Sequence, residues 1–141
     1  MKAKSGPIVR YALVCDDVRE EKSGKETLVG VYNSKIIVAG LPAVLPKLCF
    51  RIRIIPIRRA LAISLSVRAP EGGESITGLK AVIPAGSEKS EEHTLNLVMS
   101  PFVLKVEGEY SLIVEHGGKE ETALRFRTEV VKTPVVRQPK A

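Results

Sequence analysis

The stretch KLCFRIRIIPIRRALAISLSVR, residues 47–68, decides the fold, because apolar residues recur in it at every second position. It contains two apolar rows: Leu48, Phe50, Ile52 and Ile54, and then Leu61, Ile63, Leu65 and Val67. Successive side chains of a β-strand point to opposite faces of a sheet, whereas an α-helix repeats every 3.6 residues. The stretch therefore predicts two strands, the second with a buried row on one face and a polar row on the other.

The period of two continues on both sides of this stretch. It recurs in three later rows: Leu95, Leu97 and Met99; Tyr110, Leu112 and Val114; and Leu124 and Phe126. Three earlier segments, Tyr11–Cys15, Leu28–Tyr32 and Ile36–Val38, are apolar on both faces, which is typical of central strands. Short turns separate the runs, and in HGGK, residues 116–119, both glycines can take a positive φ.

These patterns together predict an all-β fold, an antiparallel β-sandwich of about eight or nine short strands. In VEGEYSLIVEHGGK, residues 106–119, a glycine two residues before Tyr110 precedes an alternating strand and a hairpin. This resembles the tyrosine corner of immunoglobulin-like domains. Leu112 stands where antibody domains have their second cysteine, so we expect an immunoglobulin-like or related sandwich rather than a true immunoglobulin domain.

The length of 141 residues matches a single domain. We predict one β-sandwich domain over residues 1–131. The last residues, 132–141, read KTPVVRQPKA and lack a packing pattern, so we expect a basic, flexible tail there.

Composition narrows the class of protein. Aromatic residues make up 4% of the chain and tryptophan is absent, which argues against stacking platforms for single-stranded nucleic acid or sugars. We find no secretory signal and no uninterrupted apolar run of about 18 residues. Cys15 and Cys49 lie in apolar segments, so we interpret them as reduced core residues of a cytoplasmic protein, with a buried disulfide as the alternative.

The net charge of +6 is unevenly distributed, because residues 47–68 include basic residues and no acidic one. Arg51 and Arg53 share one face of a predicted strand, and Arg58 and Arg59 occupy the turn that follows. Four guanidinium groups converging near one edge could bind an acidic protein surface or nucleic-acid phosphates. The alternative is a solvated outer face that keeps the sheet soluble and blocks edge-to-edge pairing.

A second candidate site lies in CDDVREEKSGKETLVGVYN, residues 15–33, where Asp16 and Asp17 end an apolar run. Clustered carboxylates can bind calcium or act as an acid and base pair. Basic residues nearly balance the charge of this loop, however, and adjacent side chains of a strand point to opposite faces. We therefore interpret the pair as a structural hairpin corner, with one aspartate bonded to backbone N–H groups and the other paired with Arg19 or Lys25.

Other catalytic and metal-binding patterns are missing from the sequence. His93 and His116 have no histidine or cysteine at metal-ligand spacing. The sequence has no Gly-x-Ser-x-Gly turn, the nucleophile elbow of many hydrolases. Its Gly-Gly pairs lie in predicted hairpins, whereas a phosphate-binding glycine loop opens a helix. We predict no metal site, no cofactor and no catalytic residue.

The series ALVCDDVREEKSGKETLVGVYN, the strand at Phe50–Arg53 and the late GEYSLIVEHGGK together resemble a family of small uncharacterised bacterial proteins, a domain of unknown function. The resemblance covers most of the chain, and the first series is its specific part. It implies a bacterial, cytoplasmic β-protein and supplies no catalytic residues. We interpret its motif residues Asp16, Asp17 and Arg19, together with Tyr110, as structural.

Three hypotheses for function remain. The leading one is a non-enzymatic accessory module that binds a protein partner or a second copy of itself, through the arginine segment and acidic hairpin surfaces. The first alternative is binding of nucleic acid or another polyanion through Arg51, Arg53, Arg58, Arg59 and the basic tail at 132–141. The second is a metal-dependent enzyme built around Asp16 and Asp17. None of the three involves a membrane.

Overall fold

The computed structural model describes residues 6–86 and 91–131, and every regular element in these ranges is a β-strand. The predicted tail at 132–141 lies outside the described residues. In the described part of the chain no helix is long and apolar enough to cross a membrane. The strands are β1 (Val9–Glu20), β2 (Glu26–Val31), β3 (Lys35–Val38), β4 (Ala43–Leu45), β5 (Leu48–Ile54), β6 (Leu61–Arg68), β7 (Ile76–Ile83), β8 (His93–Met99), β9 (Phe102–Leu104), β10 (Gly108–His116) and β11 (Lys119–Val130).

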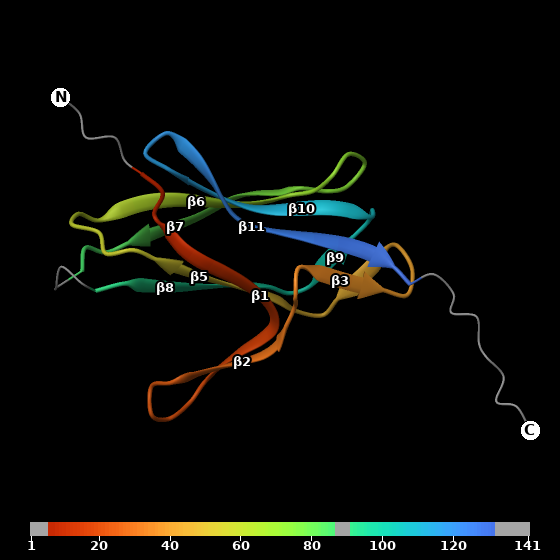
Figure 1. Ribbon diagram of the computed structural model, residues 1–141, viewed down its shortest axis with the longest axis horizontal. Coiled ribbons are helices and arrows are strands. Elements are labelled where there is room, and N and C mark those ends of the chain that lie inside the picture. Colours follow the sequence, from red (N-terminus) through yellow and green to blue (C-terminus); the bar gives the residue numbers. More distant parts are fainter. Residues whose placement is uncertain (1–5, 87–90, 132–141) are drawn as a thin grey trace, which may run out of the picture.

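The strands form two main sheets that pack face to face, as the sequence predicts (Figure 1). One sheet has the order β2-β1-β5-β8, and the other has the order β3-β11-β10-β6-β7. The short strands β4 and β9 form a separate pair. The predicted strands over 48–55 and 61–68 are β5 and β6, which belong to different sheets, so the stretch at 47–68 crosses from one layer of the sandwich to the other.

The structure departs from the predicted strand pattern in three ways. β4, β7 and β9 have no counterpart among the predicted rows, because β4 and β9 are three residues long and β7 is interrupted by Gly78 with φ +79°. The sandwich is not wholly antiparallel, since β3 pairs with β11 in parallel. β2 and β3 lie at sheet edges rather than at the centre, and their outward-facing Val31 and Ile37 are exposed.

Aromatic side chains from all three sheets meet in the core. The ring of Phe50 on β5 lies 6.4 Å from that of Phe102 on β9 and 5.9 Å from that of Phe126 on β11. Phe126 in turn stacks on Tyr110 of β10 at 5.4 Å. The Tyr110 hydroxyl donates a hydrogen bond of 2.7 Å to the backbone carbonyl of Val106, four residues earlier in the chain. These contacts hold the two main sheets together.

Candidate functional site

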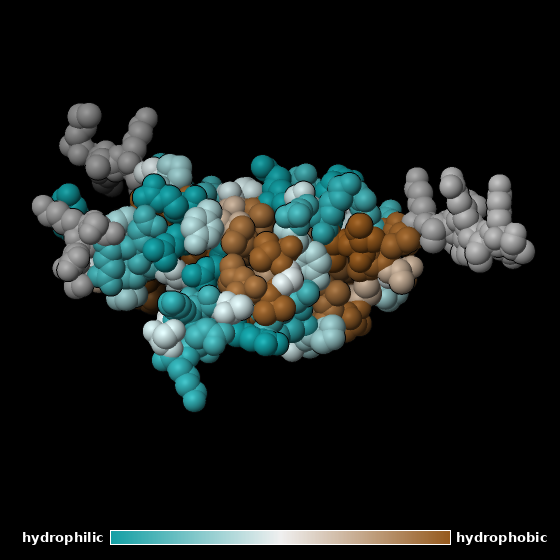
Figure 2. Space-filling view, turned by 60° about the horizontal axis from the view of Figure 1, so that its bottom comes forward, coloured by the Kyte–Doolittle hydropathy of each residue, from teal (hydrophilic) through white to brown (hydrophobic). Residues whose placement is uncertain are grey.

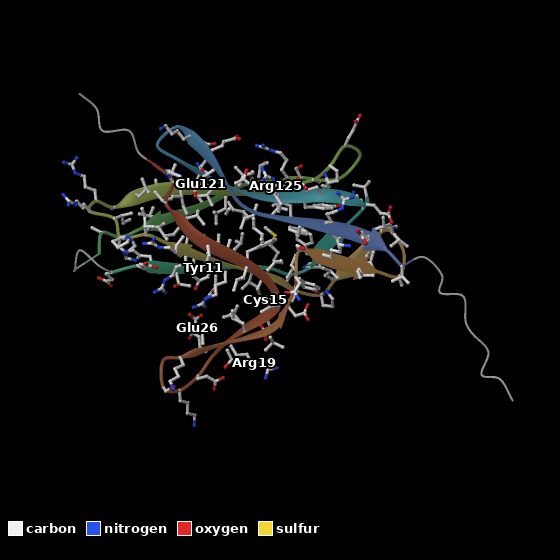
Figure 3. All side chains as sticks on the ribbon, in the orientation of Figure 1. Tyr11, Cys15, Arg19, Glu26, Glu121 and Arg125 are labelled. Atoms are coloured by element: carbon white, nitrogen blue, oxygen red, sulfur yellow. The ribbon has the colours of Figure 1, made fainter. Side chains whose placement is uncertain are left out.

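Arg51 lies on the outer face of β5, where its side chain is mostly buried and forms an ion pair. Its Nη1 is 2.9 Å from Oε1 of Glu26, the first residue of β2. The second Glu26 oxygen accepts a hydrogen bond of 2.6 Å from Nδ2 of Asn96 on β8. The hydrogen bond from Arg51 lowers the pKa of the Glu26 carboxyl, so this carboxylate stays charged. Glu26 therefore fastens the β1–β2 hairpin across β5 and β8 (Figure 3).

Arg53, two residues further along β5, is also paired within the chain. Its Nε is 3.0 Å from Oε1 of Glu92, and its Nη1 donates to the Thr94 hydroxyl at 2.7 Å. Glu92 also lies 3.2 Å from Nη2 of Arg10, and the hydrogen bond from Arg53 lowers the pKa of its carboxyl. Two arginines thus share one carboxylate, and the face of β5 is less basic than the sequence suggests.

Arg58 and Arg59 differ from the two arginines on β5. Both lie in the loop between β5 and β6 and are exposed. Within residues 6–86 and 91–131 neither has an ion-pair partner. Of the four arginines of the predicted basic site, Arg51 and Arg53 are therefore neutralised, whereas Arg58 and Arg59 have no ion-pair partner among the described residues.

Asp16 and Asp17 do not share a site, because their carboxylates bond to different elements. Asp16 accepts a hydrogen bond of 2.5 Å from the hydroxyl of Tyr32, just beyond the end of β2. The backbone of β2 passes so close to Asp16 that a Cβ on Gly30 would collide with its carboxylate, and Gly30 itself has φ +66°. The residues Gly30 and Tyr32 of the motif therefore serve the contact with Asp16.

Asp17 combines the two roles that were predicted for separate aspartates, and it has a further partner. Its Oδ1 accepts the Val18 N–H at 2.9 Å, and its Oδ2 lies 3.6 Å from Nε of Arg19. The nearest cation, however, is Lys47, whose Nζ lies 2.6 Å from Oδ1. This hydrogen bond from Lys47 lowers the pKa of Asp17. No sequence pattern indicates Lys47 as a partner, because it lies 30 positions away, just before β5.

Cys15 and Cys49 are free, buried and directly opposite each other on β1 and β5. They lie on the face of the sheet opposite Val14 and Phe50, and so outside the main core. Each thiol contacts a backbone carbonyl of Asp16 or Asp17, which together we call the aspartate corner. The Cys15 thiol lies 3.5 Å from the carbonyl of Asp17, and the Cys49 thiol lies 3.8 Å from that of Asp16. Burial raises the pKa of both thiols, which keeps them protonated.

A buried polar cluster centred on Glu121 was not predicted from the sequence. Its carboxylate oxygens accept the N–H groups of Ile8 and Val9 at 2.8 and 3.0 Å, at the start of β1. Nε2 of the buried His116 lies 3.1 Å from Oε1 of the same carboxylate. Glu121 thus ties the first strand to the last one (Figure 3). A lone glutamate in a charged hairpin carries no sequence pattern that would indicate this role.

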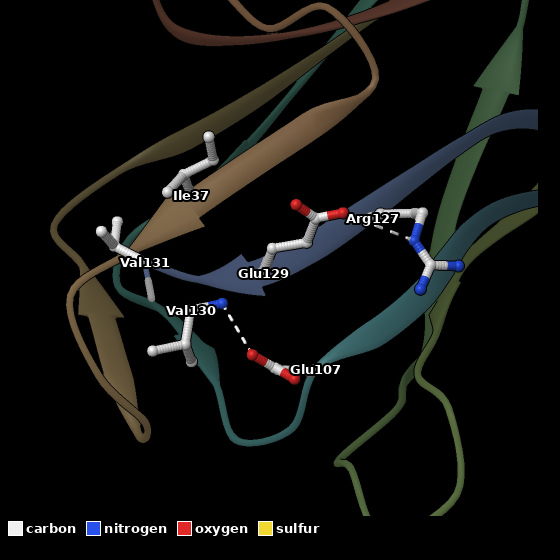
Figure 4. A pocket seen from close by; sticks show the side chains of 6 residues that line it. All are labelled: Ile37, Glu107, Arg127, Glu129, Val130 and Val131. Atoms are coloured by element: carbon white, nitrogen blue, oxygen red, sulfur yellow. Dashed lines mark hydrogen bonds and ion pairs between the residues drawn. The ribbon is translucent and has the colours of Figure 1, made fainter. Parts of the chain in front are cut away.

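A hollow of about 600 Å³ lies beside the end of β11 (Figure 4). Its charged groups are already bonded within the chain: Glu107 accepts the Val130 N–H at 2.7 Å, and Arg127 lies 3.9 Å from Glu129. The remaining lining is apolar and comes from Ile37, Val130 and Val131. In the described ranges no cluster of three potential metal-ligating side chains occurs.

Tyr32 gives a pH-dependent prediction for the aspartate corner. Burial, and secondly the Asp16 carboxylate, raise the pKa of the Tyr32 hydroxyl to about 12 from its ordinary value of 10.0. The folded chain therefore holds this proton more tightly than the unfolded chain does. The resulting stabilisation is complete below about pH 10 and is lost as the pH rises through about 12. We expect the free energy of unfolding to fall over this interval in denaturant titrations at a series of pH values.

Two variants isolate this effect. In Asp16→Asn the pKa of Tyr32, followed by tyrosinate absorbance, should move toward its ordinary value because the neighbouring negative charge is gone. In Tyr32→Phe the alkaline loss of stability should be smaller than in the wild type. An equal loss in Tyr32→Phe would show that other groups are responsible.

Asp16 and Asp17, the paired arginines of β5 and the hydrogen bond from Tyr110 to Val106 all lie within the segment that comparison with known proteins identifies. None of the curated proteins compared with this chain matches it. A family model does match, over residues 10–129, and it spans β1 through nearly all of β11. The chain therefore belongs to DUF6941, a family of unknown function.

Proposed function

We propose that the domain is a non-enzymatic accessory module that binds another protein or a second copy of itself. One observation carries the proposal: each of the four edge strands of the main sheets exposes a β-branched apolar side chain. These are Val31 on β2, Ile37 on β3, Val82 on β7 and Val98 on β8, and their exposed fractions are 43%, 60%, 69% and 50%. Apolar side chains gather in patches on one face of the molecule (Figure 2). Such patches commonly mark protein-binding surfaces.

The charged side chains support the same proposal. Arg51 and Arg53, which the polyanion alternative requires, are engaged by Glu26 and Glu92. Of the arginines on which that alternative depends, only Arg58 and Arg59 have no ion-pair partner among the described residues, and two phosphate contacts supply only a small part of the affinity of typical nucleic-acid binders. The enzyme alternative requires Asp16 and Asp17 to act together, whereas their carboxylates bond to different elements.

We also propose an immunoglobulin-like arrangement and a reducing, cytoplasmic location. The hydrogen bond from Tyr110 to Val106 and the face-to-face packing of two sheets support the first. The buried free thiols of Cys15 and Cys49 support the second, since disulfides are characteristic of oxidising compartments.

The proposed function is tested by capture with an immobilised domain, before and after nuclease treatment. We expect the wild type to retain a defined protein or further copies of itself, and the double variant Ile37→Asp, Val98→Asp to retain less of either. Lys80→Asp is the matched control, because it changes the charge of β7 without removing an apolar side chain. A wild type that retains no protein and is monomeric in light scattering at every concentration and ionic strength would contradict the proposal. Loss of the retained protein after nuclease treatment would favour the polyanion alternative.

A further inference from the structure

Strand β8 forms an edge of its sheet that lacks the usual protection against pairing. Over its whole length, His93–Met99, it pairs with β5 in one uninterrupted register. Within residues 6–86 and 91–131 no strand pairs with its other side. The strand has no glycine, proline, lysine or arginine and no bulge, and these are the features that normally block edge-to-edge pairing.

The other three edges of the main sheets are protected. β2 contains Glu26 and is bent at Gly30, which has φ +66°. β3 is only four residues long and begins with Lys35. β7 contains Gly78, Lys80 and a register shift opposite β6. Among the described strands of the main sheets, β8 is therefore the one unprotected edge.

The backbone groups that β8 presents outward follow from the hydrogen bonds of its neighbours. Ile55, just after β5, donates its N–H to the backbone carbonyl of Ile8, just before β1. The N–H and C=O groups of every second residue of β5 therefore face β1, and those of the intervening residues face β8. The register places Phe50 opposite Leu97 and Ile52 opposite Leu95, so the N–H and C=O groups of both leucines point into the sheet. Those of the intervening residues point away from it: Thr94, Asn96 and Val98.

We infer that this edge pairs with the same edge of a second copy, antiparallel about a two-fold axis through Asn96. The inference rests on the proposed function and names the partner and its surface. In this register Asn96 lies opposite Asn96 of the second copy, and Thr94 lies opposite its Val98. The three outward-facing residues then become hydrogen-bonded pairs of an antiparallel ladder. The two four-stranded sheets join into one continuous sheet.

The side chains of β8 fit this self-pairing. Leu95 and Leu97 are only partly buried, on the core side of the sheet. In the dimer, Leu95 of each copy lies opposite Leu97 of the other, and each covers exposed surface of its counterpart. On the outer face Val98, half exposed, meets Thr94. Residues 93–99 contain no aspartate, glutamate, lysine or arginine, so no like charges oppose each other. The flanking Glu92 is already neutralised by Arg53 and Arg10.

Light scattering over a concentration series tests the inference. We expect the wild type to move from one to two chain masses as concentration rises. Asn96→Lys should weaken the dimer, because it places two ammonium groups directly opposite each other on the axis. Val98→Pro is the second variant, since it removes an outward N–H and leaves the bonds to β5 intact. Val82→Lys on β7 is the matched control and should dimerise like the wild type.

Hydrogen exchange locates the interface directly. The amides of Thr94, Asn96 and Val98 should exchange about tenfold more slowly in the dimer than in the diluted wild type, because pairing removes them from water. A wild type that stays monomeric overturns the inference, and so does a dimer that persists in both β8 variants. A dimer that persists in both β8 variants would contradict only the assignment of the interface to β8, and the proposed function would remain. A domain that is monomeric and captures no protein would contradict both the inference and the proposed function.

Discussion

Replacing Phe50 by alanine is expected to lower the free energy of unfolding by about 3–5 kcal/mol, the usual effect of removing a fully buried phenylalanine. Phe50 is completely buried, and its ring touches Phe102 and Phe126. Alanine would leave a cavity at the point where all three sheets meet. Because domains of this size are stable by about 5–15 kcal/mol, the variant should be close to its unfolding threshold. Urea denaturation followed by circular dichroism measures the change.

Phe50→Leu is the matched variant. Leucine fills much of the space and keeps the strand pattern of β5, so we expect a clearly smaller loss than with alanine. Equal losses in the two variants would mean that the aromatic contacts, rather than the filled volume, carry the stability. A loss below about 1 kcal/mol in Phe50→Ala would contradict the arrangement of the core, because removal of a fully buried ring is more destabilising than that.

Glu121→Ala should have an effect of similar size, about 3–5 kcal/mol, through polar rather than apolar contacts. Its carboxylate accepts the N–H groups of Ile8 and Val9 and contacts the buried His116. Without it these groups lose their acceptor in a site from which water is largely excluded. We expect the start of β1 to detach first, visible as faster hydrogen exchange at the amides of Ile8 and Val9 at denaturant concentrations where the core is still protected.

The neighbouring residue supplies the control. Glu120 is exposed, and its carboxylate lies 3.1 Å from the guanidinium of Arg68, which is also exposed. Exposed pairs of this kind contribute about 0–1 kcal/mol, so Glu120→Ala should unfold nearly like the wild type. If both alanine variants lose the same small amount, Glu121 is not the anchor of β1.

The sequence was sufficient to predict the strands that alternate strongly. β5, β6 and β10 combine a buried apolar row with polar neighbours, and that pattern is local, so it can be read without knowing the partners of a strand. β4 and β9 were missed because three residues are too few to show a period of two. The parallel pairing of β3 with β11 was missed for another reason: a pairing partner is a long-range property that no local pattern encodes.

The same distinction separates the predicted from the unpredicted parts of the candidate site. Asp17 with Arg19 was predictable because the two residues are neighbours on one hairpin. The partners of Arg51 and Arg53 were not, since Glu26 and Glu92 lie far from them in sequence and reach them only after the sheet has formed.

The apolar edge strands show a further limit of local patterns. The apolar character of Leu28–Tyr32 and Ile36–Val38 was recognised, yet it indicated burial on both faces. The structure places these segments at edges, where part of their apolar surface stays exposed. Whether a strand is central or peripheral depends on which other strands pair with it, and those strands come from distant parts of the chain.

The position of β11 between β3 and β10 has a consequence for synthesis of the chain. β3 is translated early, but its only strand partner among the described residues is β11, whose paired residues are Arg127–Val130. On the ribosome, β3 must therefore wait, with its backbone groups unpaired, until nearly all of the domain has emerged. The sheet is completed by insertion of the last strand between two that were made before it. A chain stalled before β11 would expose two unpaired edges at once, and such nascent chains are the ones we expect chaperones to bind.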